Sequence, residues 1–234
     1  MIDTLSLNPF TGIVLTLFFY LLGAKLNKKW PNPLFTPLIF AILCVMGLLL
    51  ITDISYDEYM IGGQYFHIWV TPATVALAIK LERNYKYLKE NYLAILSGIF
   101  VGVLFHTMII LGLSILFEFN GELFATLYPK SVTTAVALGV SESLGGIVSL
   151  TVAIVVFTGI LGAVIAPTLF KITKITHPVA QGIAIGSSSH AMGTTKAIEL
   201  GEVQGAMSGL AIVVTGVTVV VFIPLAEMIL TMFF

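Results

Sequence analysis

The chain contains 234 residues, of which 58% are hydrophobic, 11 are basic and 12 are acidic, and its mean hydropathy is +1.04. Because a soluble domain carries about 25% charged residues, a charged fraction of 10% is too small to cover a water-facing surface. A net charge of −1 without a basic patch excludes nucleic-acid binding, and the single cysteine, Cys44, excludes an intrachain disulfide. The composition therefore predicts an all-α polytopic membrane protein.

Long stretches without Asp, Glu, Lys or Arg mark the expected membrane segments. About 20 apolar residues cross a hydrocarbon core of ~30 Å, and the backbone must satisfy its own polar groups there, which favours helices. The charge-free stretches are 4–24, 30–52, 59–79, 91–117, 143–170, 175–195 and 203–226. We predict about six full transmembrane helices plus two or three broken or re-entrant segments, within one integral membrane domain over 1–234.

The basic residues between these stretches predict the orientation of the chain. They cluster at 25–29, 80–89 and 171–174, whereas 53–58 is acidic. Because Lys and Arg are retained in the cytoplasm, this pattern places the N-terminus outside and keeps the first stretch as a helix rather than a cleaved signal peptide. It also requires 131–142 to enter the membrane and return to the same side.

Three parts of the chain resemble one another, which predicts internal repeats of roughly 57–61 residues. Residues 75–79 match 136–140 at an offset of 61, and Thr158-Gly159-Ile160 matches Thr215-Gly216-Val217 at an offset of 57. The repeated unit is a short segment opened by small hydroxyl residues, followed by a full helix with a Ser/Thr-Gly pair near its middle.

The three short segments begin at 71, 128 and 186, and each is rich in Pro, Gly, Ser or Thr. In lipid, helix breaks persist only where protein buries them or where they line a wet cavity. Transporters use such breaks at mid-membrane, where half-helix N-termini face anionic substrates. The alternative is that small residues only permit close helix packing. We favour packing for the glycines inside long helices and a functional role for 186–196.

Individual polar residues leave two interpretations open. Lys196 and Glu199 share a helix face and can pair, either inside the membrane, where ionisable groups are functional, or at its surface. His190 either binds an anion or relays a proton, or it is a neutral side chain bonded to a carbonyl. Lys130 either attracts an anion or reaches the interface as an ordinary lysine. Four dispersed histidines predict no metal site, and a Ser189–His190 nucleophile without an orienting Asp predicts no enzyme.

Several motifs together resemble the LrgB/CidB family of antiholin-like membrane proteins, from about residue 33 to residue 224. These motifs are Tyr56-x-x-Tyr59, Pro72-Ala73-Thr74-Val75-Ala76-Leu77-Ala78, Pro129-Lys130-Ser131-Val132-Thr133-Thr134, Gly145-Gly146, Thr158-Gly159-Ile160-Leu161-Gly162-Ala163, Gly186-x-x-Ser189-His190-Ala191-x-Gly193-Thr194 and Glu199-Leu200-Gly201-Glu202. The resemblance implies one of two functions. Members have been described as modulators of murein hydrolase activity and autolysis, acting with a small holin-like LrgA/CidA-type partner, while relatives that include a plastid fusion resemble carriers of glycolate, glycerate and pyruvate.

Tandem broken segments with hydroxyl-rich starts favour the carrier over the regulator, since a holin-like lesion needs only simple amphipathic helices. We therefore expect a transporter or channel component for a small monocarboxylate in the bacterial cytoplasmic membrane, which acts with a holin-like LrgA/CidA-type partner, without a cofactor and as a homodimer. The expected substrate-binding residues are Pro72, Thr74, Lys130, Ser131, Thr133, Thr134, Ser188, Ser189, His190, Gly193, Thr194 and Lys196, and the expected proton-coupling residues are Glu199 and Glu202. The alternative is a non-transporting, antiholin-like regulator of autolysis.

Overall fold

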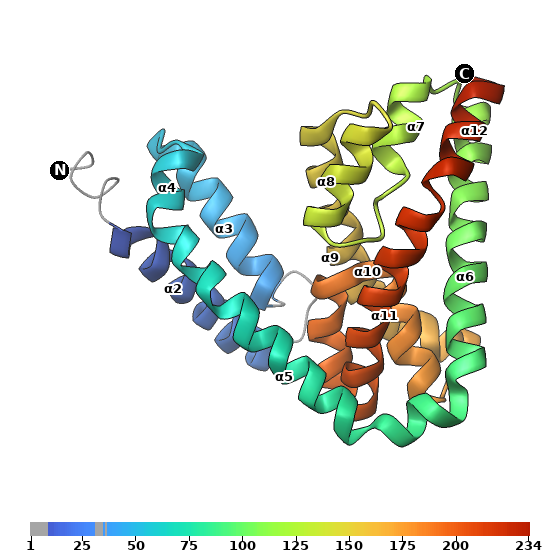
Figure 1. The fold of residues 1–234 in the computed structure, drawn as a ribbon. Coiled ribbons are helices and arrows are strands. Elements are labelled where there is room, and N and C mark those ends of the chain that lie inside the picture. Colours follow the sequence, from blue (N-terminus) through green and yellow to red (C-terminus); the bar gives the residue numbers. More distant parts are fainter. Residues whose placement is uncertain (1–8, 31–34, 36) are drawn as a thin grey trace. The chain divides into compact units, whose positions relative to one another are not determined.

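The computed structural model describes residues 9–30, 35 and 37–234, and its regular elements within them are all helical (Figure 1). The chain forms two compact units, Met1–Ala76 and Leu77–Phe234. Four of the described helices are long and apolar enough to cross a membrane: α2 (Pro9–Lys29), α6 (Tyr85–Leu116), α9 (Val148–Thr173) and α11 (Glu202–Val221). These four helices support the expected class of a multi-pass helical membrane protein.

The first unit packs α2 against α3 (Pro37–Thr52) and α4 (Tyr56–Gly63). Gly12 allows α2 to approach α4, because a Cβ atom at this position would lie only 2.6 Å from the Tyr59 carbonyl oxygen. Ser55 caps α4 in a reciprocal capping box with Glu58, and the hydrogen bonds from Ser55 lower the pKa of the Glu58 carboxyl. These contacts fix the return of the chain after α3.

The charge-free stretch 59–79 does not form the single helix that its length predicts. It is divided among α4, the 3-10 helix η2 (Gln64–Trp69) and α5 (Val70–Arg83). Pro72 lies in the first turn of α5, where a missing backbone N–H breaks no helical hydrogen bond. The proline of the first short segment therefore starts a continuous helix instead of interrupting one.

The second unit contains a hairpin of two short helices beside the first half of α9. Its limbs are α7 (Gly121–Leu127) and α8 (Thr134–Ser143). The last turn of α7 and the last turn of α8 both meet the start of α9, because Thr126 Oγ1 accepts from the Ile147 N–H at 2.8 Å and Ser141 Oγ lies 2.7 Å from Thr151 Oγ1. The apex of the hairpin, at 128–133, therefore points along α9 toward its middle (Figure 1).

The helix α10 (Pro178–Leu200) is a second hairpin, because its backbone is broken at His190. After the break the chain turns back on itself, so that a Cβ atom on Gly193 would lie 2.8 Å from Ile185 Cγ2. The two ends of α10 meet again at its base, where Gln181 and Leu200 line one cavity together with the C-terminal end of α9. The two hairpins thus approach the middle of α9 from its opposite ends.

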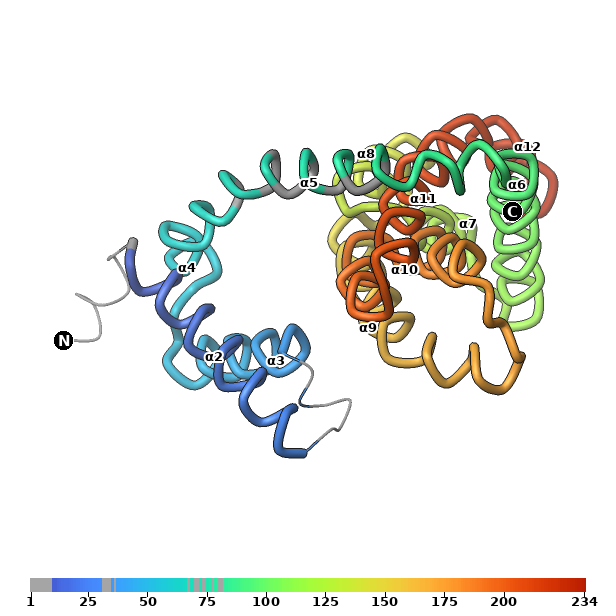
Figure 2. The backbone as a smooth tube through the Cα atoms, turned by 90° about the horizontal axis from the view of Figure 1, so that it is seen from below, coloured from blue at the N-terminus to red at the C-terminus, as the bar shows by residue number. Residues whose placement is uncertain are grey.

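The remaining helices hold the second hairpin in place. Helices α9, α10 and α11 lie side by side (Figure 2). Gly182 and Gly186 of α10 pack against the backbone of α11, where added Cβ atoms would contact the carbonyl oxygens of Gln204 and Ser208. The main apolar core joins α6, both hairpins, α9, α11 and α12 (Ile223–Phe233). Large apolar side chains, such as Phe105 and Leu116 of α6, stay exposed, as expected for a surface that faces lipid.

Candidate binding site

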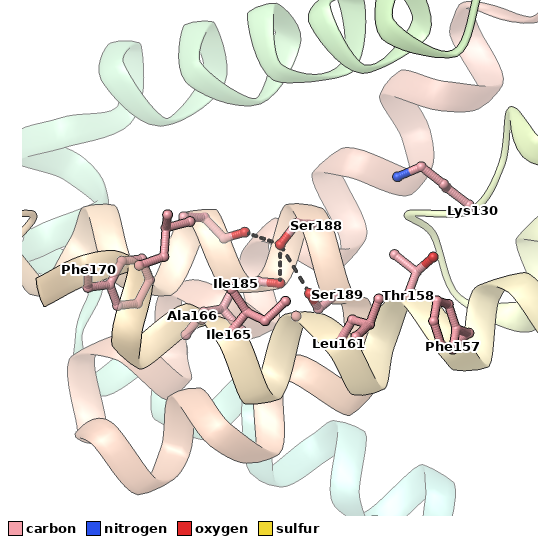
Figure 3. Close-up of a pocket in the computed structure, with 13 residues that line it drawn as sticks. Lys130, Phe157, Thr158, Leu161, Ile165, Ala166, Phe170, Ile185, Ser188 and Ser189 are labelled. Atoms are coloured by element: carbon pink, nitrogen blue, oxygen red, sulfur yellow. Dashed lines mark hydrogen bonds between the residues drawn. The ribbon is translucent and has the colours of Figure 1, made fainter. Parts of the chain in front are cut away.

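A cavity of about 430 Å³ lies between α9 and the first limb of α10, next to the apex of the α7–α8 hairpin (Figure 3). Its 13 lining residues are mostly apolar and include Phe157, Leu161 and Ile165 of α9 and Ile185 of α10. The polar side chains that reach it are Lys130, Thr158, Ser188 and Ser189. An apolar cavity with a few convergent polar groups is the usual form of a small-molecule site.

Lys130 is the charged residue among those that line this cavity. Its side chain leaves the hairpin apex, and its ammonium end points toward the side of the view where Ser188 and Ser189 lie (Figure 3). Within the described residues the ammonium group forms no ion pair and no hydrogen bond, since the ion pairs there are Lys86–Glu90 and Lys196–Glu199. A cation that borders an apolar cavity without a counter-charge favours an anionic ligand.

The apex of α10 is held in a strained conformation by contacts with α9. His190 has φ 43° and ψ −139°, a region that residues other than glycine rarely occupy. Its ring Nε2 lies 3.1 Å from the Val155 carbonyl oxygen. Because a carbonyl oxygen can only accept, Nε2 carries the proton of this bond. The carbonyl-bonded interpretation of His190 therefore describes its contact in this structure.

Two glycines of α9 make room for this apex. A Cβ atom on Gly159 would lie 2.7 Å from the His190 ring, and one on Gly162 would overlap the Ser189 side chain. The Thr158-Gly159 pair therefore has two roles in the fold. Gly159 admits the imidazole ring, and Thr158, the residue before it, lines the cavity. The packing function expected for glycines inside long helices fits both positions.

Below the apex, Thr194 ties the second limb of α10 to α11. Its hydroxyl donates to the His190 carbonyl oxygen at 2.9 Å and lies 2.7 Å from Ser208 Oγ. Both hydroxyl groups are buried, with exposed fractions of 3% for Thr194 and 0% for Ser208. Gly193 packs tightly on Ser189 and Ile185 of the first limb. Thr194, Ser208 and Gly193 brace the hairpin and do not line the cavity.

Comparisons with known proteins agree with the motifs. A model of the LrgB-like family matches residues 16–229. The antiholin-like protein LrgB of Bacillus cereus (strain B4264) is 34% identical over 221 residues, which cover 94% of this chain and 96% of that protein. The chain belongs to the LrgB-like family. The antiholin-like protein LrgB of Bacillus anthracis (strain CDC 684 / NRRL 3495) gives the same identity and coverage. No solved structure matches significantly. The resemblance drawn from the sequence is thereby confirmed.

The other candidates from the hairpin apex of this LrgB-like chain lie close to Lys130 but outside the cavity lining. Ser131 is buried with 8% exposure, and Thr133 is the N-cap residue of α8, although its side chain makes no cap hydrogen bond. Thr134 is the first residue of α8. The apex therefore presents the uncapped N-terminal turn of a helix, with its partial positive charge, next to the only charged lining residue that the structure describes.

Among the remaining candidates of this LrgB-like chain, Lys196, Glu199 and Glu202 are not lining residues of the cavity. Lys196 Nζ is 2.8 Å from Glu199 Oε2, as the spacing predicts, but the side chains are 33% and 57% exposed. Glu202 is exposed in the first turn of α11. Pro72 is exposed in the first unit, and the side chain of Thr74 lies outside the described residues. Lys196, Glu199 and Glu202 thus mark the base of the second hairpin.

Two polar residues, one in the cavity lining and one that holds the first apex, were missed by the sequence analysis. Thr158 lines the cavity, and its place in the repeated Thr-Gly pair was the available signal. Tyr128 is fully buried and donates its hydroxyl to the Val219 carbonyl oxygen at 3.0 Å, which fastens the first apex to α11. An isolated tyrosine between Leu127 and Pro129 gave no comparable signal.

Proposed function

We propose that this chain is a membrane carrier, or the channel-forming component of one, for a small monocarboxylate of the pyruvate, glycolate or glycerate class. The observation that carries the proposal is the cavity between α9 and α10, where an otherwise unpaired Lys130 meets the hydroxyl groups of Thr158, Ser188 and Ser189. In this proposal Lys130 neutralises the carboxylate, because an unpaired carboxylate in an apolar cavity is strongly disfavoured. The Thr158 hydroxyl donates a hydrogen bond to the carboxylate or to the substrate hydroxyl or keto oxygen. The Ser188 hydroxyl donates to the Ala184 carbonyl oxygen at 2.7 Å and lies 3.1 Å from Ser189 Oγ, so the two serines donate to the substrate by exchanging these bonds for it.

The arrangement of the hairpins supports transport. A shift of 57 positions carries the limits of the first hairpin, Gly121 and Ser143, onto those of the second, Pro178 and Leu200 (121 to 178, 143 to 200). The same shift carries Thr133 onto His190, the two residues at which the second limbs begin. Because the hairpins approach α9 from opposite ends, we interpret each with its following helix as one half of an inverted repeat. Such repeats place the substrate site of transporters where their broken helices meet.

The membrane placement follows from the same interpretation. Both hairpins are re-entrant and place their apices near the bilayer centre, while α6, α9 and α11 span it. The six-span count then requires 59–79 to cross as an interrupted segment beside α2 and α3. The three basic clusters place the N-terminus outside the bacterial cytoplasmic membrane. A holin-like LrgA/CidA-type partner and a homodimer complete the proposed assembly.

The direct test is uptake of labelled pyruvate or glycolate into proteoliposomes that contain the purified chain, with and without the holin-like partner. We expect saturable uptake, and we expect Lys130→Ala to raise the KM at least tenfold, because loss of one charged contact to a buried carboxylate removes about 1.5–3 kcal/mol. Lys130→Arg keeps the charge and retains part of the uptake. The matched control is Lys25→Ala, which removes a lysine of the first unit and leaves the cavity lining unchanged. The absence of saturable flux in every preparation would exclude the carrier.

The second candidate function is that of a regulatory subunit that restrains a holin-like partner. The relatives named antiholin-like protein LrgB favour it. This function predicts effects on autolysis and membrane potential that do not depend on any carboxylate, and it predicts that Lys130→Ala leaves them unchanged. Measurement of autolysis in cells that carry the Lys130→Ala variant therefore separates the two functions.

A further inference from the structure

A second cavity lies at the opposite end of α9 from the α7–α8 hairpin, where the base of α10 meets the turn between α9 and α10. Its volume is about 360 Å³. The lining residues are Pro167, Phe170, Lys171, Lys174, Ile175, Thr176, Gln181 and Leu200. Phe170 lines both this cavity and the one that contains Lys130, and the other lining residues belong to this cavity alone. This cavity therefore has its own set of polar groups.

The lining of this cavity is divided between two lysines and an apolar wall. Lys171 and Lys174 come from the last turn and the C-cap of α9, and neither forms an ion pair or a hydrogen bond within the described residues. The wall consists of apolar side chains from α9, the turn and the returning limb of α10. Two unpaired ammonium groups beside an apolar wall fit an amphiphile with an anionic head better than a free anion.

Hydrogen bonds inside the protein give this cavity a fixed shape. Gln181 donates from Nε2 to the Ile175 carbonyl oxygen at 2.8 Å and accepts from Gln204 Nε2 at 3.1 Å. The Ile175 N–H in turn donates to the Phe170 carbonyl oxygen at 3.0 Å, which closes the end of α9 after the left-handed residue Lys174. Both polar atoms of the Gln181 side chain thus already have a protein partner, and Gln181 joins the turn, α10 and α11. Lys171, Lys174 and Thr176 remain as the polar ligand groups.

We propose that this cavity binds the phosphate headgroup of an anionic phospholipid, with Lys171 and Lys174 on the phosphate and the apolar wall against the glycerol and upper acyl chains. The end of a spanning helix places the cavity at headgroup depth, and the positive-inside bias places it in the cytoplasmic leaflet, where anionic lipids are attracted to basic segments. Because the cavity includes both the end of α9 and Leu200, a bound lipid joins α9 to the base of the second hairpin. The site does not depend on the transport of a carboxylate.

The test is retention of lipid by the purified full chain in native mass spectrometry, with phosphatidylglycerol, phosphatidylcholine and inorganic phosphate as separate probes. We expect phosphatidylglycerol to be retained in preference to phosphatidylcholine, and inorganic phosphate at a hundredfold excess not to displace it. The double variant Lys171→Gln/Lys174→Gln is expected to weaken retention on the order of tenfold or more, given the usual attraction of lysines to anionic lipid. Equal retention of both lipids, or displacement by phosphate alone, would overturn the proposal.

Two further variants separate the cavity from general surface charge. Lys86→Gln/Lys89→Gln removes the same charge at the same spacing from the first turns of α6, outside the cavity, and is expected to retain the lipid. Leu200→Trp fills the cavity without changing any charge, and this variant is expected to lose the bound lipid. If the α6 pair weakens retention as much as the α9 pair, or if Leu200→Trp has no effect, the lipid binds to charge in general and the site is disproved. Thermal unfolding of each variant in detergent verifies that it folds.

Discussion

The two hairpins of the second unit reverse the chain in different ways. The first uses six residues between α7 and α8, and its apex is fastened to α11 by the hydroxyl of Tyr128. The second reverses within one helix at His190, at the cost of a backbone conformation that favours glycine, and its apex is fastened to α9 by the imidazole ring. The loop of the first leaves room for a long side chain, Lys130, to reach the cavity.

This difference suggests a division of labour between the apices. A six-residue loop can carry a charged ligand group because it has side chains that are not needed for the turn. A one-residue reversal has no such freedom, so its adjacent serines contribute short hydroxyl groups from fixed positions. The predictions below test whether the second apex depends on close packing and strain while the first depends on a single hydrogen bond.

The largest effect is expected for Gly162→Ala, which places a methyl group where the Ser189 side chain lies. Overpacking of this kind costs about 1–3 kcal/mol of unfolding free energy, against which the better helix propensity of alanine contributes about 1 kcal/mol. The control is Gly102→Ala in α6, where the added Cβ atom meets nothing within 4 Å and helix propensity favours alanine by about 1 kcal/mol. Thermal unfolding in detergent should therefore shift the two variants in opposite directions. Equal stability of both would show that the α9–α10 contact is not tight.

The next effect concerns the strain at His190. His190→Ala loses the bond to the Val155 carbonyl oxygen and keeps the left-handed backbone, whereas His190→Gly loses the same bond and relieves the backbone. Glycine relieves about 1–3 kcal/mol of backbone strain at this position, but it also costs about 1 kcal/mol because the unfolded chain gains conformational freedom. His190→Gly is therefore expected to be more stable than His190→Ala by about 1 kcal/mol. The comparison uses the unfolding midpoints of the two variants. A more stable alanine variant would mean that the reversal is not strained.

A smaller loss is expected for Tyr128→Phe at the first apex. The change removes the hydroxyl that donates to the Val219 carbonyl oxygen and leaves the ring in the core. The net contribution of such a hydrogen bond is about 1 kcal/mol. Tyr92→Phe, at a side chain that is 51% exposed, serves as the control and should be neutral. If the two substitutions had the same effect, the bond to α11 would not hold the apex.

The smallest effect is expected for Lys196→Gln at the base of the second hairpin. Its ion pair with Glu199 is short at 2.8 Å, but both side chains are partly exposed. Ion pairs of this kind contribute about 0–1 kcal/mol, so the unfolding midpoint should hardly move and should be insensitive to added salt. A loss of unfolding free energy well above this range would mean that the pair lies in a dry environment. It would then favour the interpretation of Lys196 and Glu199 as functional residues inside the membrane.

Much of the local organisation was predictable because it depends on neighbours in the sequence. Apolar length marked α2, α6, α9 and α11, and the cluster of Gly, Ser and Thr marked 186–196 as a break. The i,i+3 spacing of Lys196 and Glu199 predicted their pair. The prediction of a single helix over 59–79 was wrong because the absence of charge does not exclude a turn. Helix α4 ends in Gly62-Gly63, and η2 begins directly after it.

The sequence by itself determined the class of the molecule, its family and two of the positions at which its helices are interrupted, near 128–133 and 186–196, because composition, charge spacing and motifs act within short lengths of chain. Only the tertiary structure decided which polar groups meet. Lys130, Thr158 and Ser188 are far apart in the chain and share a cavity only because α9 and the two hairpin apices converge. The same convergence brings the His190 ring into a hydrogen bond with a carbonyl oxygen of α9. It also leaves the Lys130 ammonium without a partner among the described residues. Neither outcome follows from the spacing of residues along one helix.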